Sequence, residues 1–193
     1  MTPHPVVSRA AQGTLPEWAV AGEERRAHMA RVAELMAAWA ASLGLKAEDR
    51  VRWVAAAYLH DALRDEDPAV LRERVSPAER SLPGAVLHGP AAAERLRIDG
   101  VLDGELLLAV AGHTVGDPRF GPLGRALYVA DFLEPGRSYV PEWRAELRGR
   151  MPAALNDVTF EVARARLGRG LDRGAPLQTR TVSFWNRLVE ERA

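Results

Sequence analysis

The segment LYVADFLEPGR, residues 127–137, places an aspartate in the middle of an apolar run. The surrounding pattern predicts a buried helix over residues 123–133, ended by the Pro-Gly pair that follows it. An ionised carboxylate without partners costs several kcal/mol in such a place. Asp131 therefore needs a partner, which would be an arginine such as Arg125 or Arg137, backbone amides, or a metal ion shared with other side chains.

The periodicity of apolar residues along the rest of the chain indicates helices only. Apolar residues recur at spacings of three and four, and there is no alternating strand pattern, internal repeat or low-complexity tract. Helices are expected at residues 23–44, from 47 through the apolar run 53–59, and at 90–97, 104–113, 123–133, 141–150, 152–167 and 179–190. The fold class is therefore predicted to be all-α.

The chain is predicted to hold one domain preceded by a short lead-in. Residues 1–22 contain three prolines and two glycines with no clear period, so we expect them to be irregular. No linker divides residues 23–193, and a chain of 193 residues can bury a substantial single core. We expect one domain over residues 23–193.

Composition excludes several classes of function. Acidic and basic residues balance at 26 each, which gives no overall electrostatic reason to bind nucleic acid or an anionic membrane. The absence of cysteine excludes thiolate chemistry and Cys-type zinc sites, so a metal site must use His, Asp and Glu. No apolar run approaches the ~20 residues of a membrane span. The expected location is the cytoplasm.

Four of the five histidines lie in comparable settings close to the ends of expected helices: His28, His60, His88 and His113. Taken singly, such a histidine is more often a hydrogen-bonded core or capping residue than a metal ligand. The adjacent His60 and Asp61 can likewise be an ordinary C-terminal cap. A metal interpretation has to come from the whole set.

Asp131 favours the metal interpretation because its burial is otherwise hard to compensate. A metal shared with His28, His60 and Asp61 would satisfy its charge more completely than one arginine. Neutral imidazoles with carboxylates suit Fe, Mn, Zn or Ni, whereas an all-oxygen cage would suit Ca or Mg. Four imidazoles and two carboxylates are enough for two metal ions, with Asp61 placed to bridge them.

The order H, HD, H, H, D resembles that of the HD-domain metal phosphohydrolases, whose ligands come from successive helices of an all-α bundle. The chain also resembles the bacterial YqeK-type symmetrical diadenosine tetraphosphatases along nearly its whole length, apart from residues 1–20. The segments that carry the resemblance are RRAHMARV, YLHDALR, LHGPAAA, AGHTVGDP, LYVADFLEPGR and TRTVSFWNRLV. Six ordered blocks, among them the EPxR sequence after Asp131, are far more specific than the HD pair alone.

The resemblance implies an HD-type helical bundle with a dinuclear metal centre. One metal would be held by His28, His60, Asp61 and Asp131, and the other by His88 and His113 with Asp61 bridging. The ions would be divalent or of mixed valence, with iron favoured over Mn, Zn, Ni or Mg.

The resemblance also implies a hydrolase acting on phosphoric anhydrides, which cleaves diadenosine tetraphosphate symmetrically to two ADP by attack of a metal-activated hydroxide. Arg137, the arginine of EPxR, would bind phosphate, and Arg25 matches another basic position of the family. Arg64 stands where the family often has lysine, so it keeps the charge but changes the shape of the contact. Thr114, beside His113, is a further candidate for substrate binding.

Two other functions fit the sequence. One is a different HD phosphohydrolase that acts on a nucleoside monophosphate or cyclic nucleotide, since metal ligands do not specify the organic part of a substrate. The other is a module that binds nucleotide or nucleic acid, which the arginines of residues 161–180 would favour, although a solvated helix face explains them more simply. We expect a nucleotide substrate and neither nucleic acid nor a membrane as partner, and dimerisation stays open.

Overall fold

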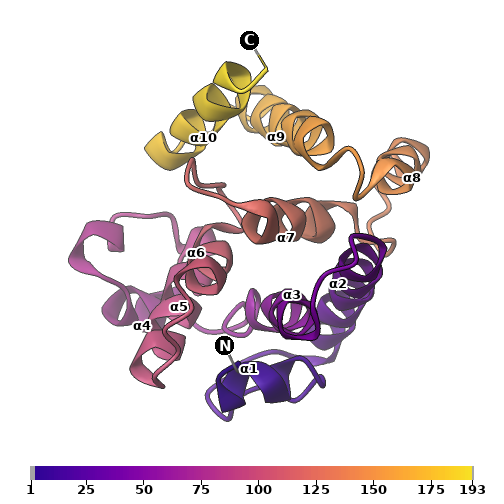
Figure 1. Cartoon of the computed structure of the whole chain (residues 1–193). Coiled ribbons are helices and arrows are strands. Elements are labelled where there is room, and N and C mark those ends of the chain that lie inside the picture. Colours follow the sequence, from indigo (N-terminus) through magenta and orange to yellow (C-terminus); the bar gives the residue numbers. More distant parts are fainter. Residues whose placement is uncertain (1–2, 193) are drawn as a thin grey trace.

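The computed structural model describes residues 3–192, and every regular element within them is a helix (Figure 1). The α-helices are α1 Pro5–Ala10, α2 Glu23–Ser42, α3 Ala47–Leu59, α4 Pro68–Arg74, α5 His88–Ile98, α6 Gly104–Gly112, α7 Pro122–Leu133, α8 Pro141–Arg150, α9 Leu155–Asp172 and α10 Thr179–Glu190. Two short 3₁₀ turns, Pro77–Glu79 and Gly84–Val86, lie between α4 and α5. The predicted all-α fold class is confirmed.

Local signals in the sequence explain where several helices begin and end. Asp67 and Asp103 cap α4 and α6, because each side chain accepts a hydrogen bond from a backbone N–H in the first turn. Prolines occupy the first turn of α4, α7 and α8, where a missing N–H costs nothing. Gly44 follows α2 with φ of +63°, the left-handed conformation that ends many helices.

Helix α7 forms the centre of the molecule. Every residue from Leu123 to Leu133 is buried, and Figure 1 shows α7 between α9 and α10 on one side and α3 and α6 on the other. Helix α2 packs extensively against α3, and both also contact α7. A helix that is buried on all sides has to be central, so a polar residue on α7 is held in a fixed position and needs partners there.

The lead-in differs from its predicted irregular form. Pro5–Ala10 is helical, because Pro5 occupies the first helical position instead of breaking the segment, and Val7 and Ala10 are buried against α3. Farther along, the backbone N–H of Val20 donates to the carbonyl of Ala62 at 2.8 Å. The expectation of irregular structure is therefore wrong for residues 5–10, and residues 1–2 lie outside the described part.

Two expected helices are shifted along the sequence. The helix expected at 90–97 begins at His88, and the one expected at 152–167 begins at Leu155 and continues to Asp172. Among residues 3–192, no helix combines the length and apolar character required to cross a membrane. The extent of the domain, residues 23–193, stays a prediction.

Candidate metal centre

The ends of successive helices bring the histidines and aspartates singled out from the sequence into one buried cluster. His60 and Asp61 follow the last residue of α3, His88 opens α5, and His113 follows the last residue of α6. His28 and Asp131 project from α2 and α7. We call these six residues the His–Asp cluster: His28, His60, Asp61, His88, His113 and Asp131.

Asp61 lies between two pairs of imidazoles. Its Oδ1 is 3.1 Å from Nε2 of His88 and 3.4 Å from Nε2 of His113. Its Oδ2 is 3.7 Å from Nε2 of His28 and 3.6 Å from Nε2 of His60. Each carboxylate oxygen thus faces a different pair, which is the arrangement that a bridging carboxylate requires.

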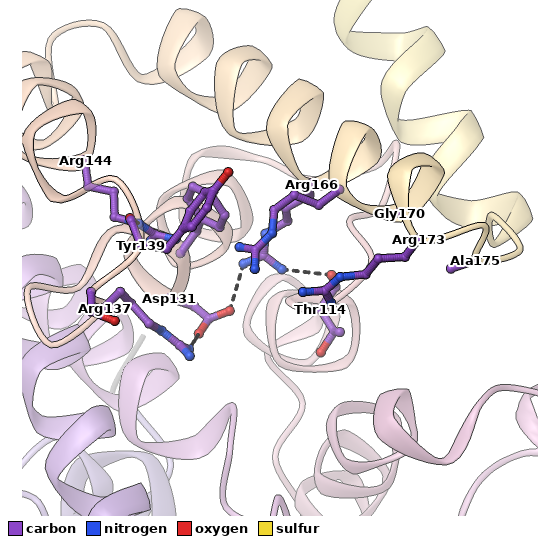
Figure 2. Close-up of a pocket in the computed structure, with 12 residues that line it drawn as sticks. Thr114, Asp131, Arg137, Tyr139, Arg144, Arg166, Gly170, Arg173 and Ala175 are labelled. Carbon is purple, nitrogen blue, oxygen red and sulfur yellow. Dashed lines mark hydrogen bonds and ion pairs between the residues drawn. The ribbon is translucent and has the colours of Figure 1, made fainter.

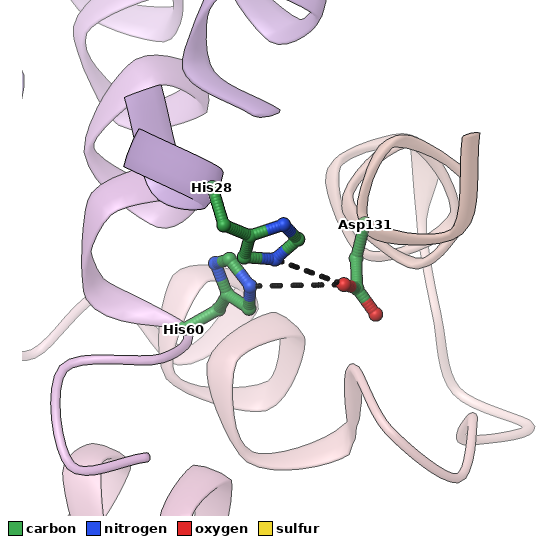
Figure 3. Close-up of side chains that lie close together, drawn as sticks. All are labelled: His28, His60 and Asp131. Atoms are coloured by element: carbon green, nitrogen blue, oxygen red, sulfur yellow. Dashed lines mark ion pairs between the residues drawn. The ribbon is translucent and has the colours of Figure 1, made fainter. Parts of the chain in front are cut away.

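Asp131 closes one side of the cluster. Its Oδ1 is 3.2 Å from Nε2 of His28 and 4.0 Å from Nε2 of His60 (Figure 3). These three residues form one group whose donor atoms all lie within 4.8 Å of one another. A second group of this kind consists of His60, Asp61 and His113.

The second group differs from the set implied by the resemblance, which paired His113 with His88. Nε2 of His88 is nevertheless only 3.0 Å from Nε2 of His113, so the His88 ring lies beside this second group. His60 is close to both groups, because its ring packs against that of His28 at 5.5 Å and that of His113 at 4.7 Å between centroids.

Hydrogen bonds on the far side of three rings fix their orientation. Nδ1 of His60 donates to the carbonyl of Ala57 at 2.7 Å, and Nδ1 of His113 donates to that of Val110 at 2.8 Å. Because a carbonyl can only accept, the proton is on Nδ1 and the lone pair of Nε2 points into the cluster. The His28 ring is held in the same way, with Nδ1 3.2 Å from Oε1 of Glu134.

Glu134 is a supporting residue that the sequence reasoning did not single out. It accepts from Nε of Arg31 at 2.5 Å and from the backbone N–H of Gly136 at 2.7 Å, while its other oxygen faces His28. These bonds hold the pKa of Glu134 below its usual range although its burial opposes this. The signal was available in EPxR, where the glutamate follows Asp131 by three residues on the same helical face.

The residues present fit a divalent cation. Nε2 of His28 and Nε2 of His60 are buried and have no hydrogen-bond partner within the described chain. Burial lowers the pKa of His60 to about 4, and the imidazoles around Asp61 hold the pKa of its carboxyl well below the usual range although burial opposes this. Neutral imidazole lone pairs facing ionised carboxylates repel unless a cation lies between them.

The pKa of His60 predicts how the stability of the metal-free protein depends on pH. Folding lowers this pKa from 6.5 to about 4, so the unfolded chain binds more protons between these values. The stabilisation is complete above pH 6.5 and is lost as the pH falls toward 4. The free energy of unfolding, measured with denaturant, should be lower at pH 5 than at pH 7.5 by about 2 kcal/mol.

His60→Gln serves as the control for this pH dependence, because it removes the titrating ring. The variant should show a flatter pH profile whatever its absolute stability. Equal unfolding free energies of the wild type at pH 5 and pH 7.5 would contradict the assignment of His60 as a neutral, buried imidazole.

Three arginines contact the carboxylates of the cluster. Arg25 donates to Oδ2 of Asp61 at 2.6 Å. Arg137 donates to Oδ1 of Asp131 at 3.1 Å, and Arg166 donates to Oδ2 at 2.8 Å. Arg137 was one of the two arginines suggested from the sequence as partners of Asp131, and it makes this contact. Arg166 had not been suggested.

Arg125 does not reach Asp131, which corrects the other suggestion. It donates to Asn156 and Glu191 at 2.8 Å each. The reason is helical geometry, since a separation of six residues on α7 turns the two side chains about 120° apart. Arg64, the third predicted basic residue of the site, is half-buried, and its side chain makes no hydrogen bond or ion pair with residues 3–192.

A cavity of about 510 Å³ opens beside Asp131 (Figure 2). Thr114 lines it, with its hydroxyl 3.0 Å from Nε2 of His113 and its carbonyl accepting from Arg166. The other polar side chains around it are mainly arginines: Arg137, Arg144, Arg166, Arg169 and Arg173. We call this the arginine cavity.

The arginines of residues 161–180 thus divide into two groups. Arg166, Arg169 and Arg173 line the arginine cavity, whereas Arg164 is exposed. Arg180 lies instead within ion-pair distance of Glu79 and Asp117. A continuous basic face for nucleic acid is therefore not the arrangement adopted by this segment.

The all-helical fold and the buried His–Asp cluster define the class to which the protein belongs. Residues 25–136 match the HD domain family, and because this match covers more than half of the 193 residues, the chain belongs to that family. It is an HD-domain hydrolase. The matched region contains all six residues of the His–Asp cluster.

Similar proteins include two with a stated activity. The chain is 27% identical over 149 residues to the symmetrical bis(5'-nucleosyl)-tetraphosphatase of Halalkalibacterium halodurans, covering 70% of this chain and 75% of that protein. It is 30% identical over 89 residues to the protein of the same name from Staphylococcus aureus, covering 43% of this chain and 46% of that one.

A solved structure shares the fold. It is that of a predicted HD superfamily hydrolase involved in NAD metabolism from Clostridium acetobutylicum, with a TM-score of 0.78 and 22% sequence identity. The alignment covers 96% of each chain, so the helices outside the HD match, including α8 to α10, belong to the shared architecture.

Proposed function

We propose that this protein hydrolyses diadenosine tetraphosphate symmetrically to two ADP. One observation carries the proposal: Asp131 belongs both to the His–Asp cluster and to the lining of the arginine cavity. A site for metal ions and a site suited to several phosphates therefore share one carboxylate. The names of the two curated relatives support the same substrate.

The His–Asp cluster would hold two metal ions, with iron favoured. His28, His60 and Asp131 would bind one ion and His88 and His113 the other, while Asp61 would contact both through its two oxygens. When bound, two such ions supply a water of lowered pKa and draw charge from the attacked phosphorus. The hydrogen bonds from Nδ1 of His60 and His113 direct their Nε2 lone pairs into the cluster, where they would be ligands.

Arginines of the chain would bind and orient the phosphate groups. Arg137 is 44% exposed and close to Asp131, so its guanidinium can donate to substrate oxygens beside the cluster. Arg25 lies at the same edge through its contact with Asp61, and Arg64 has donors available. As the bond between the second and third phosphates breaks, these donors would stabilise the charge that moves onto the leaving ADP.

Product analysis tests the proposal. Protein loaded with Fe, and in parallel with Mn, Zn, Ni or Mg, is incubated with diadenosine tetraphosphate and the nucleotides are separated. We expect ADP as the sole nucleotide product. Equal amounts of ATP and AMP would show asymmetrical cleavage, and absence of turnover with every metal would also reject the proposal.

A panel of other nucleotides distinguishes the related hypothesis of a different HD phosphohydrolase. Nucleoside monophosphates and cyclic nucleotides should be poor substrates, because they leave most arginines of the cavity without a phosphate. A higher kcat/KM for either class than for diadenosine tetraphosphate would favour that alternative.

A further inference from the structure

The arginine cavity carries much more positive charge than its carboxylate can neutralise. Among its lining residues are five arginines but only one acid, Asp131. That acid is already shared by Arg137 and Arg166. Three arginines, Arg144, Arg169 and Arg173, have no carboxylate within ion-pair distance in the described chain.

Arg144 shows most clearly that a partner is missing. The residue is only 2% exposed, yet its Nη1 is buried without a hydrogen-bond partner in residues 3–192. Nε donates to the carbonyl of Tyr139 at 2.6 Å, and the guanidinium lies 4.1 Å from the centroid of the Phe132 ring. The head group is therefore held in place with its Nη1 donors unused, which is costly for a buried polar group.

Two arginines of α9 are positioned in a similar way to Arg144 on α8. The guanidinium of Arg166 lies 4.4 Å from the centroid of the Tyr128 ring, and its Nε is also buried without a partner. That of Arg169 lies 4.6 Å from the centroid of Tyr139. Stacking on aromatic rings orients the planar guanidinium groups and leaves their edges for an anion.

Crowding of like charges points to the same conclusion. Burial and the neighbouring Arg137, Arg169 and Arg166 lower the pKa of Arg144. Positive groups that disfavour one another in the free protein bind an anion strongly, since the anion removes their mutual repulsion. A ligand with one negative charge could pair with only some of these arginines, whereas a chain of phosphates could pair with all of them.

We propose that Arg144, Arg166, Arg169 and Arg173 form a subsite for the phosphates of the departing nucleoside diphosphate, and so select substrates with long phosphate chains. The inference rests on the proposed function. All four residues come after residue 136, where the match to the HD domain family ends. The proposal thereby assigns metal binding to the HD-matched part of the chain and selection for the length of the phosphate chain to the part that follows it.

Calorimetric titration of the metal-loaded, full-length protein with ADP tests the subsite. Arg169→Gln and Arg173→Gln are suitable variants because neither residue makes an ion pair that holds the fold. Each should weaken ADP binding by about tenfold, the loss expected for one charged hydrogen bond to phosphate. Arg169→Lys should restore part of the affinity, since it keeps the charge but not the planar fork.

Arg164→Gln is the matched control, because Arg164 lies on the same helix but is exposed and outside the cavity. It should bind ADP as the wild type does. Equal ADP affinities of wild type, Arg164→Gln, Arg169→Gln and Arg173→Gln would overturn the subsite.

Kinetics give a second readout. For Arg169→Gln, KM for diadenosine tetraphosphate should rise about tenfold with a smaller change in kcat, and the preference over dinucleoside diphosphates should fall. An unchanged preference would count against the subsite.

The binding measurement does not depend on turnover. If the wild type binds ADP through Arg169 but releases no ADP from the tetraphosphate, the subsite stands and the proposed function fails. If the wild type forms two ADP but neither variant changes the affinity for ADP, the proposed function stands and the subsite fails.

Discussion

Asp61→Asn should lose both metal and activity. The wild type is expected to contain about two metal ions per chain, and the variant markedly fewer, with kcat/KM lower by more than about 100-fold, since even loss of a residue that only supports a ligand costs 10–100-fold. The reason is that the two oxygens of Asp61 face different imidazole pairs, His88 at 3.1 Å and His60 at 3.6 Å. An amide presents a neutral oxygen to one pair and an N–H donor to the other.

Elemental analysis of purified protein, together with the tetraphosphate assay, measures this effect. Asp103→Asn is the control, because Asp103 also pairs with an arginine but lies at the opposite end of α6 from His113. It should lose some stability through its ion pair with Arg52 and keep its metal, since asparagine still caps the helix. Wild-type activity and metal content in Asp61→Asn would refute the bridging role.

Gly116→Ala should destabilise the protein by about 3 kcal/mol, from overpacking together with an unfavourable backbone conformation. Gly116 has φ of +79°, and a Cβ placed on it would overlap Cδ1 of Phe184. Phe184 cannot move aside easily, because it is 1% exposed and packs edge-on against Tyr128 and Phe120.

The same substitution should disturb the site, since Gly116 is three residues from His113 and its contact with Phe184 docks α10 on that loop. Chemical denaturation gives the loss of stability. Gly149→Ala is the matched control: its Cβ would meet nothing within 4 Å on an exposed face of α8, so it should be neutral or slightly stabilising. If both variants unfold at the same denaturant concentration as the wild type, the packing of α10 is not as described.

Local patterns predicted the helices well because helix formation depends on nearby residues. The amphipathic repeat at 179–190 and the proline-opened segment at 141–150 correspond to α10 and α8 as observed. The prediction for residues 1–22 was wrong in part because the prolines at positions 3 and 5 were interpreted as residues that prevent a helix. Pro5 instead begins α1. A proline near a chain start is ambiguous until its neighbours are known to be buried.

The sequence by itself determined which residue types are available for chemistry. An aspartate inside the apolar run of α7, a His-Asp pair at the end of α3 and three further histidines identified the residues that the fold brings together. This was possible because helix ends and apolar faces are local properties, and burial of a charge limits what can surround it.

Only the tertiary structure decided which arginines reach that aspartate. Arg125, on the same helix, points away to Glu191, whereas Arg166, 35 residues later, donates to Asp131. The arginines of residues 161–180 were most simply explained from the sequence as a solvated helix face. Because α9 packs against α7, three of them line a cavity instead. Contacts between distant segments depend on how whole helices pack against one another. The local periodicity of a sequence predicts each helix but not which helices pack together.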